Sequence, residues 1–380
     1  MDDRLADIFA TISPTEIAHV AGAVLEMPGI QPDSVTYSEI KKPHADTRTI
    51  GIVRVAGIAT ATGAARSWSC VTKIIDMSAV NMTETPVDPR NEVQIYTSGL
   101  FSAPVGGFRR ARCYHVSHPR EGQMILWLED LTGAEGAPFP IDVLSQMARD
   151  LGMWNAATAA NPPQIDFPVG RDFQWASLTG FDFPARLVGL REIADDPVVR
   201  DMYARLPIDF AAEFVEAHGR LARRSLTLPH VLSLADCPVS NFFHLPGQTI
   251  AIDWAGLGYE PVGADGGRFI GSAMTWGRDF VEVVLREGEL FESYLQGMRA
   301  GGSTEDRDIL RIGYLSEAAY YLCTVLTCPT IFAGPLAKMP PAFFEKRFEM
   351  PMNEFGPAAA AAIDLLPPLV QEMRRLIPYQ

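Results

Sequence analysis

The spacing of apolar residues changes once along the chain, near residue 131, and this change restricts the possible folds more than any other feature. Before it, residues 35–41, 49–56 and 66–75 are rich in β-branched residues and alternate in polarity, as strands do. After it, apolar residues recur every three to four positions, as in residues 143–154, which is the spacing of one helix face. The sequence therefore predicts an α+β fold with a strand-rich N-terminal lobe and a helical C-terminal lobe.

The two lobes are expected to cover residues 1–131 and 132–380, with a hinge near residues 129–133. A short apolar strand over residues 248–253 interrupts the helical part and ends in a carboxylate. Further helices are expected over residues 280–298, 306–326 and 358–377.

Composition and charge set limits on the function. The chain has 380 residues, of which 47% are apolar and 21% charged, as in globular proteins. Its formal net charge of -14 argues against a nucleic acid or an anionic membrane as partner, because both would repel the average surface. No apolar run reaches the roughly 18 residues that span a bilayer, and the first residues lack a signal-peptide pattern. We therefore expect a cytoplasmic protein whose five cysteines, without a Cys-x-x-Cys pair, are reduced thiols.

One short segment has the spacing of a kinase catalytic loop. Phosphoryl transfer requires mainly positioning and charge, with oxygen ligands for magnesium and a carboxylate that orients the attacking hydroxyl. Asp236 and Asn241 form an Asp-x-x-x-x-Asn pair, in which the aspartate accepts the hydroxyl proton and the asparagine coordinates metal. Asp253 follows at the end of the apolar strand, where a second oxygen ligand for magnesium is expected.

The N-terminal lobe offers a cation for the donor phosphates. Lys73 lies near the end of a predicted strand among apolar residues, so that its ammonium group projects from a rigid element. Glu92, nineteen residues later, opens a helical stretch and is expected to pair with Lys73. The nucleotide base is expected at the hinge, beside Glu129 to Leu131.

Each of these residues also has a purely structural interpretation. Asp236 and Asn241 are typical of turns, where their side chains satisfy backbone groups. Asp253 could cap a loop, and Lys73 could be an edge-strand lysine whose ammonium group reaches solvent. Their order along the chain favours the catalytic interpretation over these alternatives.

Longer segments resemble a known family. Residues 228–241 and 251–254 resemble the signature of the aminoglycoside phosphotransferases and related small-molecule kinases. Residues 91–96 are similar to the glutamate-bearing helix of that family, and residues 125–131 to the strand that leads to its hinge. The resemblance spans most of the chain and implies a protein-kinase-like fold. It also implies transfer of the γ-phosphate of ATP or GTP, with magnesium, to a hydroxyl group of a small acceptor.

The resemblance implies a role for individual residues. Residues 258–265 resemble the segment after the metal-binding aspartate, which gives Asp265 the role of supporting the catalytic-loop backbone. Tyr259 and Glu260 are the residues that we expect to contact the acceptor. The implied roles are Asp236 as base, Asn241 and Asp253 as magnesium ligands, Lys73 and Glu92 at the donor phosphates, and Glu129 and Leu131 at the nucleotide base.

Three features depart from related patterns. Leu234 stands where the family usually has a histidine that braces the catalytic loop. The turn at residues 42–47, expected to cover the phosphates, has no glycine to allow close approach of its backbone. The alternative function is therefore a pseudokinase, a nucleotide-binding or partner-binding module. Pro238 stands where protein kinases carry a basic residue, and this favours a small-molecule acceptor over a protein.

Overall fold

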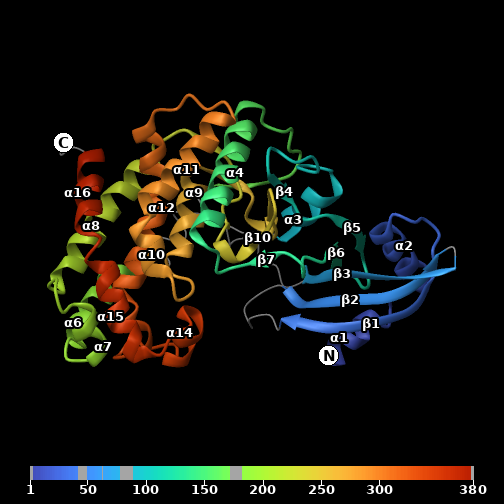
Figure 1. Cartoon of the computed structure of the whole chain (residues 1–380), viewed down its shortest axis with the longest axis horizontal. Helices are drawn as coiled ribbons and strands as arrows, with labels where there is room; N and C mark the ends of the chain where they lie inside the picture. Colours follow the sequence, from blue (N-terminus) through green and yellow to red (C-terminus); the bar gives the residue numbers. More distant parts are fainter. Residues whose placement is uncertain (1–2, 42–48, 62, 78–88, 172–181, 378–380) are drawn as a thin grey trace. The chain divides into compact units, whose positions relative to one another are not determined.

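The computed structural model describes residues 3–41, 49–61, 63–77, 89–171 and 182–377. The chain forms two compact units (Figure 1). One consists of Met1–Ala103 and Arg109–Ala134, and the other of Pro104–Phe108 and Glu135–Gln380. The first unit is built on an antiparallel sheet and the second is mostly helical, which confirms the predicted α+β class. The turn at residues 42–47 lies outside the described residues.

The sheet of the first unit has the strand order β1-β2-β3-β6-β5, and every neighbouring pair is antiparallel. The three strands predicted over residues 35–41, 49–56 and 66–75 lie within β1, β2 and β3. The strands of this sheet are β1 (Pro32–Lys41), β2 (Thr49–Ala61), β3 (Ala64–Asp76), β5 (Cys113–Ser117) and β6 (Gln123–Glu129).

Two helices that were not predicted from the sequence precede the sheet. They are α1 (Asp3–Phe9) and α2 (Pro14–Leu25), the second capped by the Ser13 side chain, which accepts a hydrogen bond from the backbone of Glu16. Their apolar side chains join those of the sheet, Trp127 among them, in one core cluster. No single helix of the described residues is long and apolar enough to cross a membrane, and α1 and α2 pass that test only as a pair bent by 87°.

Two small sheets have the strand orders β4-β11-β10-β7 and β8-β12-β9, and apart from Arg109 and Arg110 of β4 their residues belong to the second unit. The carbonyl of Gly107 accepts a hydrogen bond of 2.8 Å from the backbone of Thr249, which ties Pro104–Phe108 to this unit although the sequence places it in the first lobe. The strands are β4 (Phe108–Arg110), β7 (Glu135–Gly136), β8 (Gly170–Arg171), β9 (His230–Ser233), β10 (Phe242–Leu245), β11 (Gln248–Ala251) and β12 (Gly258–Pro261).

Helices make up most of the other described residues of the second unit, where α4 packs on α11 and α9 on α12. The contact between α9 and α12 is close, because a Cβ atom at Gly267 would lie only 1.9 Å from the carbonyl oxygen of Tyr314. The helices are α4 (Ile141–Ala160), α6 (Phe183–Glu192), α7 (Pro197–Met202), α8 (Asp209–Ser225), α9 (Ala264–Ala273), α10 (Phe280–Leu285), α11 (Glu287–Ala300), α12 (Arg307–Thr327), α13 (Pro329–Phe332), α14 (Pro341–Phe348), α15 (Met352–Ile363) and α16 (Pro367–Leu376).

The predicted helix over residues 306–326 corresponds to α12, but the other two are wrong as single helices. The helix expected over residues 280–298 is broken at Arg286, whose φ of -96° and ψ of 9° lie outside the α-helical region. The helix expected over residues 358–377 is split into α15 and α16. Pro367 starts the second of these, because proline fits the first turn of a helix but cannot continue a preceding one.

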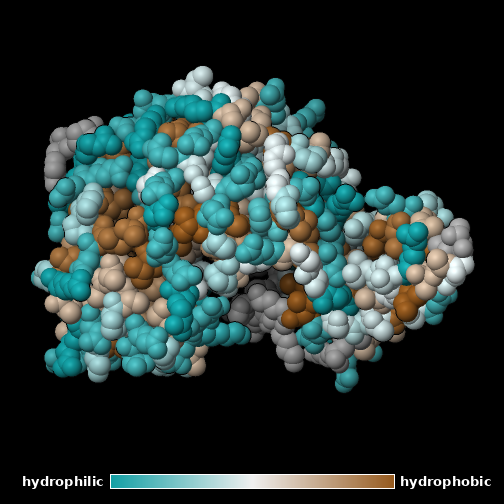
Figure 2. Space-filling model, viewed as in Figure 1, coloured by the Kyte–Doolittle hydropathy of each residue, from teal (hydrophilic) through white to brown (hydrophobic). Residues whose placement is uncertain are grey.

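Hydrophilic side chains cover most of the face shown in Figure 2, with apolar side chains between them. The large apolar side chains that are at least 40% exposed belong to several different elements, so that they need no ligand to explain them. Among the described residues they are Ile40, Ile58, Val188, Leu285, Met339 and Phe343.

Candidate active site

Lys73 and Glu92 form an ion pair within the first unit. Lys73 lies on β3, a central strand, in register with Ile52 of β2 and Leu126 of β6. Its Nζ atom is 2.7 Å from Oε2 of Glu92, which lies in the first turn of α3 (Pro89–Thr97). The Glu92 side chain is fully buried and that of Lys73 is 13% exposed. The expected contact is therefore present, and it holds the ammonium group on a rigid element.

The carboxylate of Glu129, at the end of β6, is bound within the first unit. It accepts hydrogen bonds of 2.7 and 2.9 Å from the guanidinium of Arg109 and one of 3.1 Å from the backbone of Arg112. Burial alone would raise the pKa of Glu129, but these bonds and the two positive charges outweigh burial and lower it. Leu131 is buried. A contact of this segment with a nucleotide base stays a prediction.

The catalytic-loop motif begins directly after β9. The backbone N–H of Asp236 donates to the carbonyl of Leu234 at 2.8 Å, so that Ala235 is the central residue of a γ-turn. Ala235 has a φ of 59°, a conformation that is unfavourable for residues with a Cβ atom. Asp236 itself is partly exposed.

The structure brings Asn241 and Asp253 to the same loop region as Asp236. The side-chain amide of Asn241 donates to the carbonyl of Asp236 at 3.2 Å, and the carbonyl of Asn241 accepts from the backbone of Ile252 at 2.9 Å. The segments approach so closely that a Cβ atom at Gly256 would lie 2.8 Å from Cβ of Asp236. Asn241 and Asp253 are both partly exposed, like Asp236.

Asp265, in the first turn of α9, is bonded to the loop backbone. Its carboxylate accepts hydrogen bonds from the backbone N–H groups of Leu234, at 2.9 Å, and Ala235, at 3.1 Å. The side-chain amide of Asn155 donates to the same carboxylate at 2.8 Å, and the hydroxyl of Tyr294 donates to the amide oxygen of Asn155. All of these polar groups are buried, and the contacts are those expected of a residue that supports the loop.

The two predicted acceptor contacts on β12 differ in accessibility. Tyr259 is partly exposed, whereas Glu260 is 1% exposed. Neighbouring residues of a strand point to opposite faces, and Glu260 lies on the buried face, where its charge acts on the guanidinium of Arg268. The structure therefore argues against Glu260 as an acceptor contact.

The side chains of Asn241 and Asp253 fit a magnesium ion. Carboxylate and amide oxygens are the ligands that magnesium prefers, and it usually keeps water and phosphate oxygens as its other ligands. The part of the chain that the structure describes has no group of three or more His, Cys, Asp or Glu side chains that could hold a metal. Asn241 and Asp253 each supply one side-chain group of the kind that magnesium prefers.

No protein-family model and no curated protein matches the sequence. Solved structures do match. An aminoglycoside phosphotransferase from Alicyclobacillus acidocaldarius is 13% identical, with 89% of this chain and 92% of that chain covered and a TM-score of 0.48. An amicoumacin kinase in complex with AMP-PNP, Ca2+ and Ami is 14% identical, with 94% and 96% covered and a TM-score of 0.46. A choline/ethanolamine kinase family protein from Mesorhizobium loti is 13% identical, with 95% and 98% covered and a TM-score of 0.43. Their names fall in the class of small-molecule kinases that the sequence resembles.

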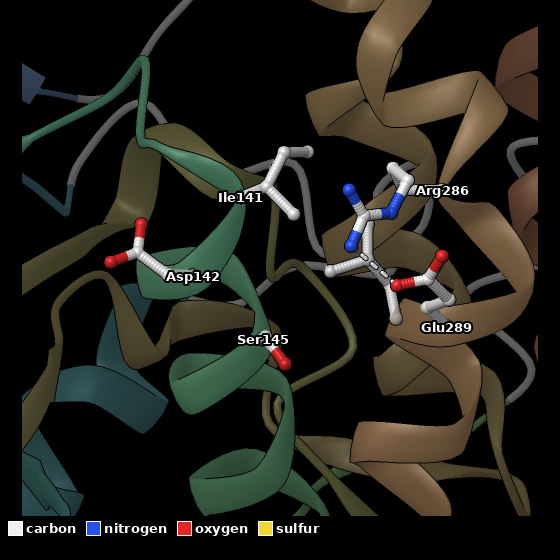
Figure 3. Close-up of a pocket in the computed structure, with 6 residues that line it drawn as sticks. Ile141, Asp142, Ser145, Arg286 and Glu289 are labelled. Carbon is white, nitrogen blue, oxygen red and sulfur yellow. Dashed lines mark hydrogen bonds and ion pairs between the residues drawn. The ribbon is translucent and has the colours of Figure 1, made fainter.

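A surface cavity of about 490 Å³ lies between the start of α4 and the junction of α10 and α11 (Figure 3). The guanidinium of Arg286 and the carboxylate of Glu289 are paired at 2.5 Å, and Asp142 points away from them. The residues that line the cavity include none of those predicted for the site, so the cavity does not identify an acceptor. They are Ile141, Asp142, Ser145, Arg286, Glu289 and Leu290.

Arg268, a buried arginine of α9 that contacts the catalytic loop, is not among the residues predicted for the site. Its guanidinium donates a hydrogen bond to the carbonyl of Ala235 and forms an ion pair with Glu317 of α12. A signal exists in the sequence, because Arg268 follows Asp265 by three positions and therefore shares a helix face with it. The contact with Glu317 has no such signal.

Proposed function

We propose that this chain is a small-molecule kinase that transfers the γ-phosphoryl group of ATP or GTP to a hydroxyl group of a small acceptor. The observation that supports it most is the assembly of Asp236, Asn241 and Asp253 in one hydrogen-bonded loop region. A carboxylate base with amide and carboxylate metal ligands is the set that phosphoryl transfer requires. The ion pair of Lys73 with Glu92 adds the cation that donor phosphates need.

Each residue has a defined task in this proposal. Asp236 orients the acceptor hydroxyl and takes its proton as the hydroxyl oxygen bonds to the γ-phosphorus. Asn241 and Asp253 hold magnesium through their side-chain oxygens, and Lys73 neutralises charge on the donor phosphates. The bound magnesium nucleotide supplies the phosphoryl group. Asp265 acts through the loop backbone, since its carboxylate is buried against backbone N–H groups.

The proposed acceptor is a small molecule. Pro238 cannot supply the positive charge that protein kinases place two residues after the catalytic aspartate. The net charge of -14 favours a neutral or cationic acceptor. Tyr259 is the partly exposed residue of β12 that we propose as an acceptor contact.

The second candidate function is a pseudokinase that binds nucleotide or a partner without efficient transfer. Leu234 favours it, because an apolar side chain that is only 3% exposed forms no hydrogen bond to the loop. The γ-turn at Ala235 then depends on other groups for its conformation.

One measurement tests nucleotide binding, and a second separates a kinase from a pseudokinase that binds nucleotide. Magnesium with ATP or GTP should raise the melting temperature in both cases, since a ligand at 100 times its Kd stabilises the native state by about 2.7 kcal/mol. Only a kinase should consume ATP when it is offered a panel of amino alcohols, sugars and aminoglycosides in a coupled assay. The substitution Asp236→Asn should then lower turnover by about 1,000-fold and leave the nucleotide-induced shift in place.

Asp209→Asn is the matched control, because Asp209 is a 74% exposed carboxylate on α8 and its loss should leave turnover unchanged. Equal turnover of Asp236→Asn and the unmodified protein would remove Asp236 from the mechanism. If neither nucleotide raised the melting temperature, the kinase and a nucleotide-binding pseudokinase would both be wrong.

A further inference from the structure

We infer that Arg268, supported by Glu317, is a positioning residue that fixes the backbone at Ala235 and thereby aims the carboxylate of Asp236. This inference rests on the proposed kinase function. Arg268 lies on α9 and Glu317 on α12, and neither is predicted to touch a reactant. Their side chains are 4% and 2% exposed.

The contacts define the arrangement. One terminal nitrogen of the Arg268 guanidinium donates to the carbonyl of Ala235. The Nε atom and the other terminal nitrogen lie 2.9 and 2.7 Å from Oε2 of Glu317. A planar guanidinium held on one edge by a carboxylate points its remaining donor in a fixed direction. Glu317 therefore determines where Arg268 donates.

The backbone of Ala235 is held at both of its polar groups by buried charged side chains. The carboxylate of Asp265 accepts from its N–H group and the guanidinium of Arg268 donates to its carbonyl. A γ-turn at a φ of 59° is strained for alanine, and such a conformation persists only when the surrounding contacts impose it. Because Asp236 is the next residue, the direction of its side chain follows from this turn.

Electrostatics keeps Arg268 in the form that this role needs. Burial opposes the charged guanidinium, but the carboxylates of Glu317 and Glu260 outweigh burial and raise the pKa of Arg268. Leu234, whose side chain has no donor, leaves the polar support of the turn to α9. The buried position of Glu260 gains an explanation here, because its charge favours the charged form of Arg268.

The competing explanation is that Arg268 and Glu317 only join α9 to α12. A variant that removes both charges separates the two explanations, since replacing a buried ion pair by apolar residues of similar volume usually preserves folding. The variant is Arg268→Met with Glu317→Leu. The control is Arg311→Met with Glu287→Leu and Glu372→Leu, another buried cluster, in which Arg311 of α12 contacts Glu287 of α11 and Glu372 of α16 instead of the loop.

The first readout is hydrogen exchange of the full chain, measured by mass spectrometry on the peptide over residues 230–241. The Arg268→Met/Glu317→Leu variant should exchange the amides of the turn about tenfold faster than the unmodified protein. The control variant should leave this peptide unchanged. Unchanged exchange in the test variant, or equally fast exchange in the control, would overturn the inference. This readout requires no turnover, so it stays informative if the kinase function itself proves wrong.

The second readout is kinetic, with the acceptor that supports ATP consumption. We expect kcat of the test variant to fall about 100-fold, because a displaced catalytic group is costly, while KM for ATP stays within about twofold. In an Asp236→Asn background the same pair of substitutions should cost nothing further, because Arg268 acts only through Asp236. A fall that is equally large in that background, or a loss confined to KM, would contradict a positioning role.

Arg268→Lys provides a second test that does not depend on the double variant. Lysine retains the charge but has no planar edge to bind Glu317 and Ala235 together. We expect a partial loss of kcat and a partial gain in exchange. Full activity with protected amides in Arg268→Lys would show that the charge alone suffices and would overturn the geometric argument.

Discussion

Replacing the single residue Lys73 should affect both stability and the use of ATP. Its ammonium group is the cation that lies 2.7 Å from the fully buried carboxylate of Glu92. Lys73→Met removes that cation, so the free energy of unfolding should fall by about 3 kcal/mol, as when one partner of a buried pair is lost. If Lys73 also binds the donor phosphates, kcat/KM for ATP should fall by about 100-fold. Denaturant unfolding and ATP kinetics measure the two effects separately.

The matched control keeps the fold and removes the charge from both partners. Lys73→Met combined with Glu92→Leu should recover most of the lost stability, because no buried carboxylate is then left without its cation. Its kcat/KM should remain low. Recovery of activity together with stability would mean that Lys73 has only a structural role.

Site residues that are close together in the sequence could be predicted, whereas those whose positions depend on distant contacts could not. Asp236, Asn241 and Asp253 are close in the chain and joined by short segments, so their assembly follows from spacing. Glu260 was predicted as an acceptor contact but is only 1% exposed, because the face of β12 on which it lies is set by packing against α9. Arg268 was missed for a similar reason, since its partner Glu317 lies 49 positions away.

The contact between α9 and α12 gives a prediction at the scale of elements. Gly267→Ala would place a Cβ atom 1.9 Å from the backbone oxygen of Tyr314, and backbone on a packed helix cannot move aside cheaply. The free energy of unfolding should therefore fall by at least about 2 kcal/mol. Gly219→Ala is the control, because Gly219 of α8 has no atom within 4 Å of the added Cβ. That variant should gain up to about 1 kcal/mol, and a loss there would contradict the packing argument.

The contact between α8 and α12 should make stability depend on pH. His218 of α8 is 2% exposed and donates from Nε2 to the carbonyl of Ser316 at 2.9 Å. Burial lowers the pKa of His218 to about 4, from a usual value of about 6.5. The unfolded chain therefore binds more protons between these values, and stability falls as the pH decreases from about 6.5 to about 4. The loss amounts to about 3 kcal/mol, at about 1.4 kcal/mol for each pH unit.

Denaturant unfolding at several pH values between 4 and 7 tests this dependence. His218→Gln can keep a donor toward Ser316 but does not titrate, so its stability should vary less over that range. His118→Gln removes an exposed imidazole and should leave the pH profile of the unmodified protein in place. An identical profile in His218→Gln would show that other groups cause the acid sensitivity.

Strands and helices were predictable where a long segment has apolar residues at a single regular spacing. The long strands β2 and β3 and the helix α12 have one clear period each. The N-terminal helices α1 and α2 were not predicted, because short apolar stretches suit several structures until they meet a core. Apolar residues keep the spacing of a helix on both sides of Arg286, so the sequence does not show that the helix breaks there.

At the scale of the whole molecule, the change in apolar spacing near residue 131 lies close to the end of the first unit at Ala134, but nothing in the sequence marks the segment Pro104–Phe108. It belongs to the second unit because β11 supplies a hydrogen-bond donor, at Thr249, that is distant in sequence. Both units can be probed by their thiols. All five cysteines are free, as the sequence predicted, with Cys70 and Cys113 in the first unit and the other three in the second.

These thiols should react slowly in the folded protein. Burial raises the pKa of Cys70 to about 12 and that of Cys113 to about 11, so that little thiolate exists at pH 8. Cys237, Cys323 and Cys328 are also buried, and burial raises their pKa values as well. Labelling with a disulfide reagent should therefore modify Cys113 first, because it is the partly exposed thiol, and all five in denaturant.

Peptide mapping of the labelled protein identifies which cysteines have reacted, and so reports local opening in each unit separately. Labelling of Cys70 requires opening of the sheet core, and labelling of Cys237 requires opening of the loop that Asp265 holds. If magnesium and nucleotide bind as proposed, they should slow modification of Cys237 in proportion to the added stability. Rapid modification of Cys237 in native buffer, at the rate of the unfolded chain, would show that the catalytic loop is open and would contradict the fixed turn at Ala235.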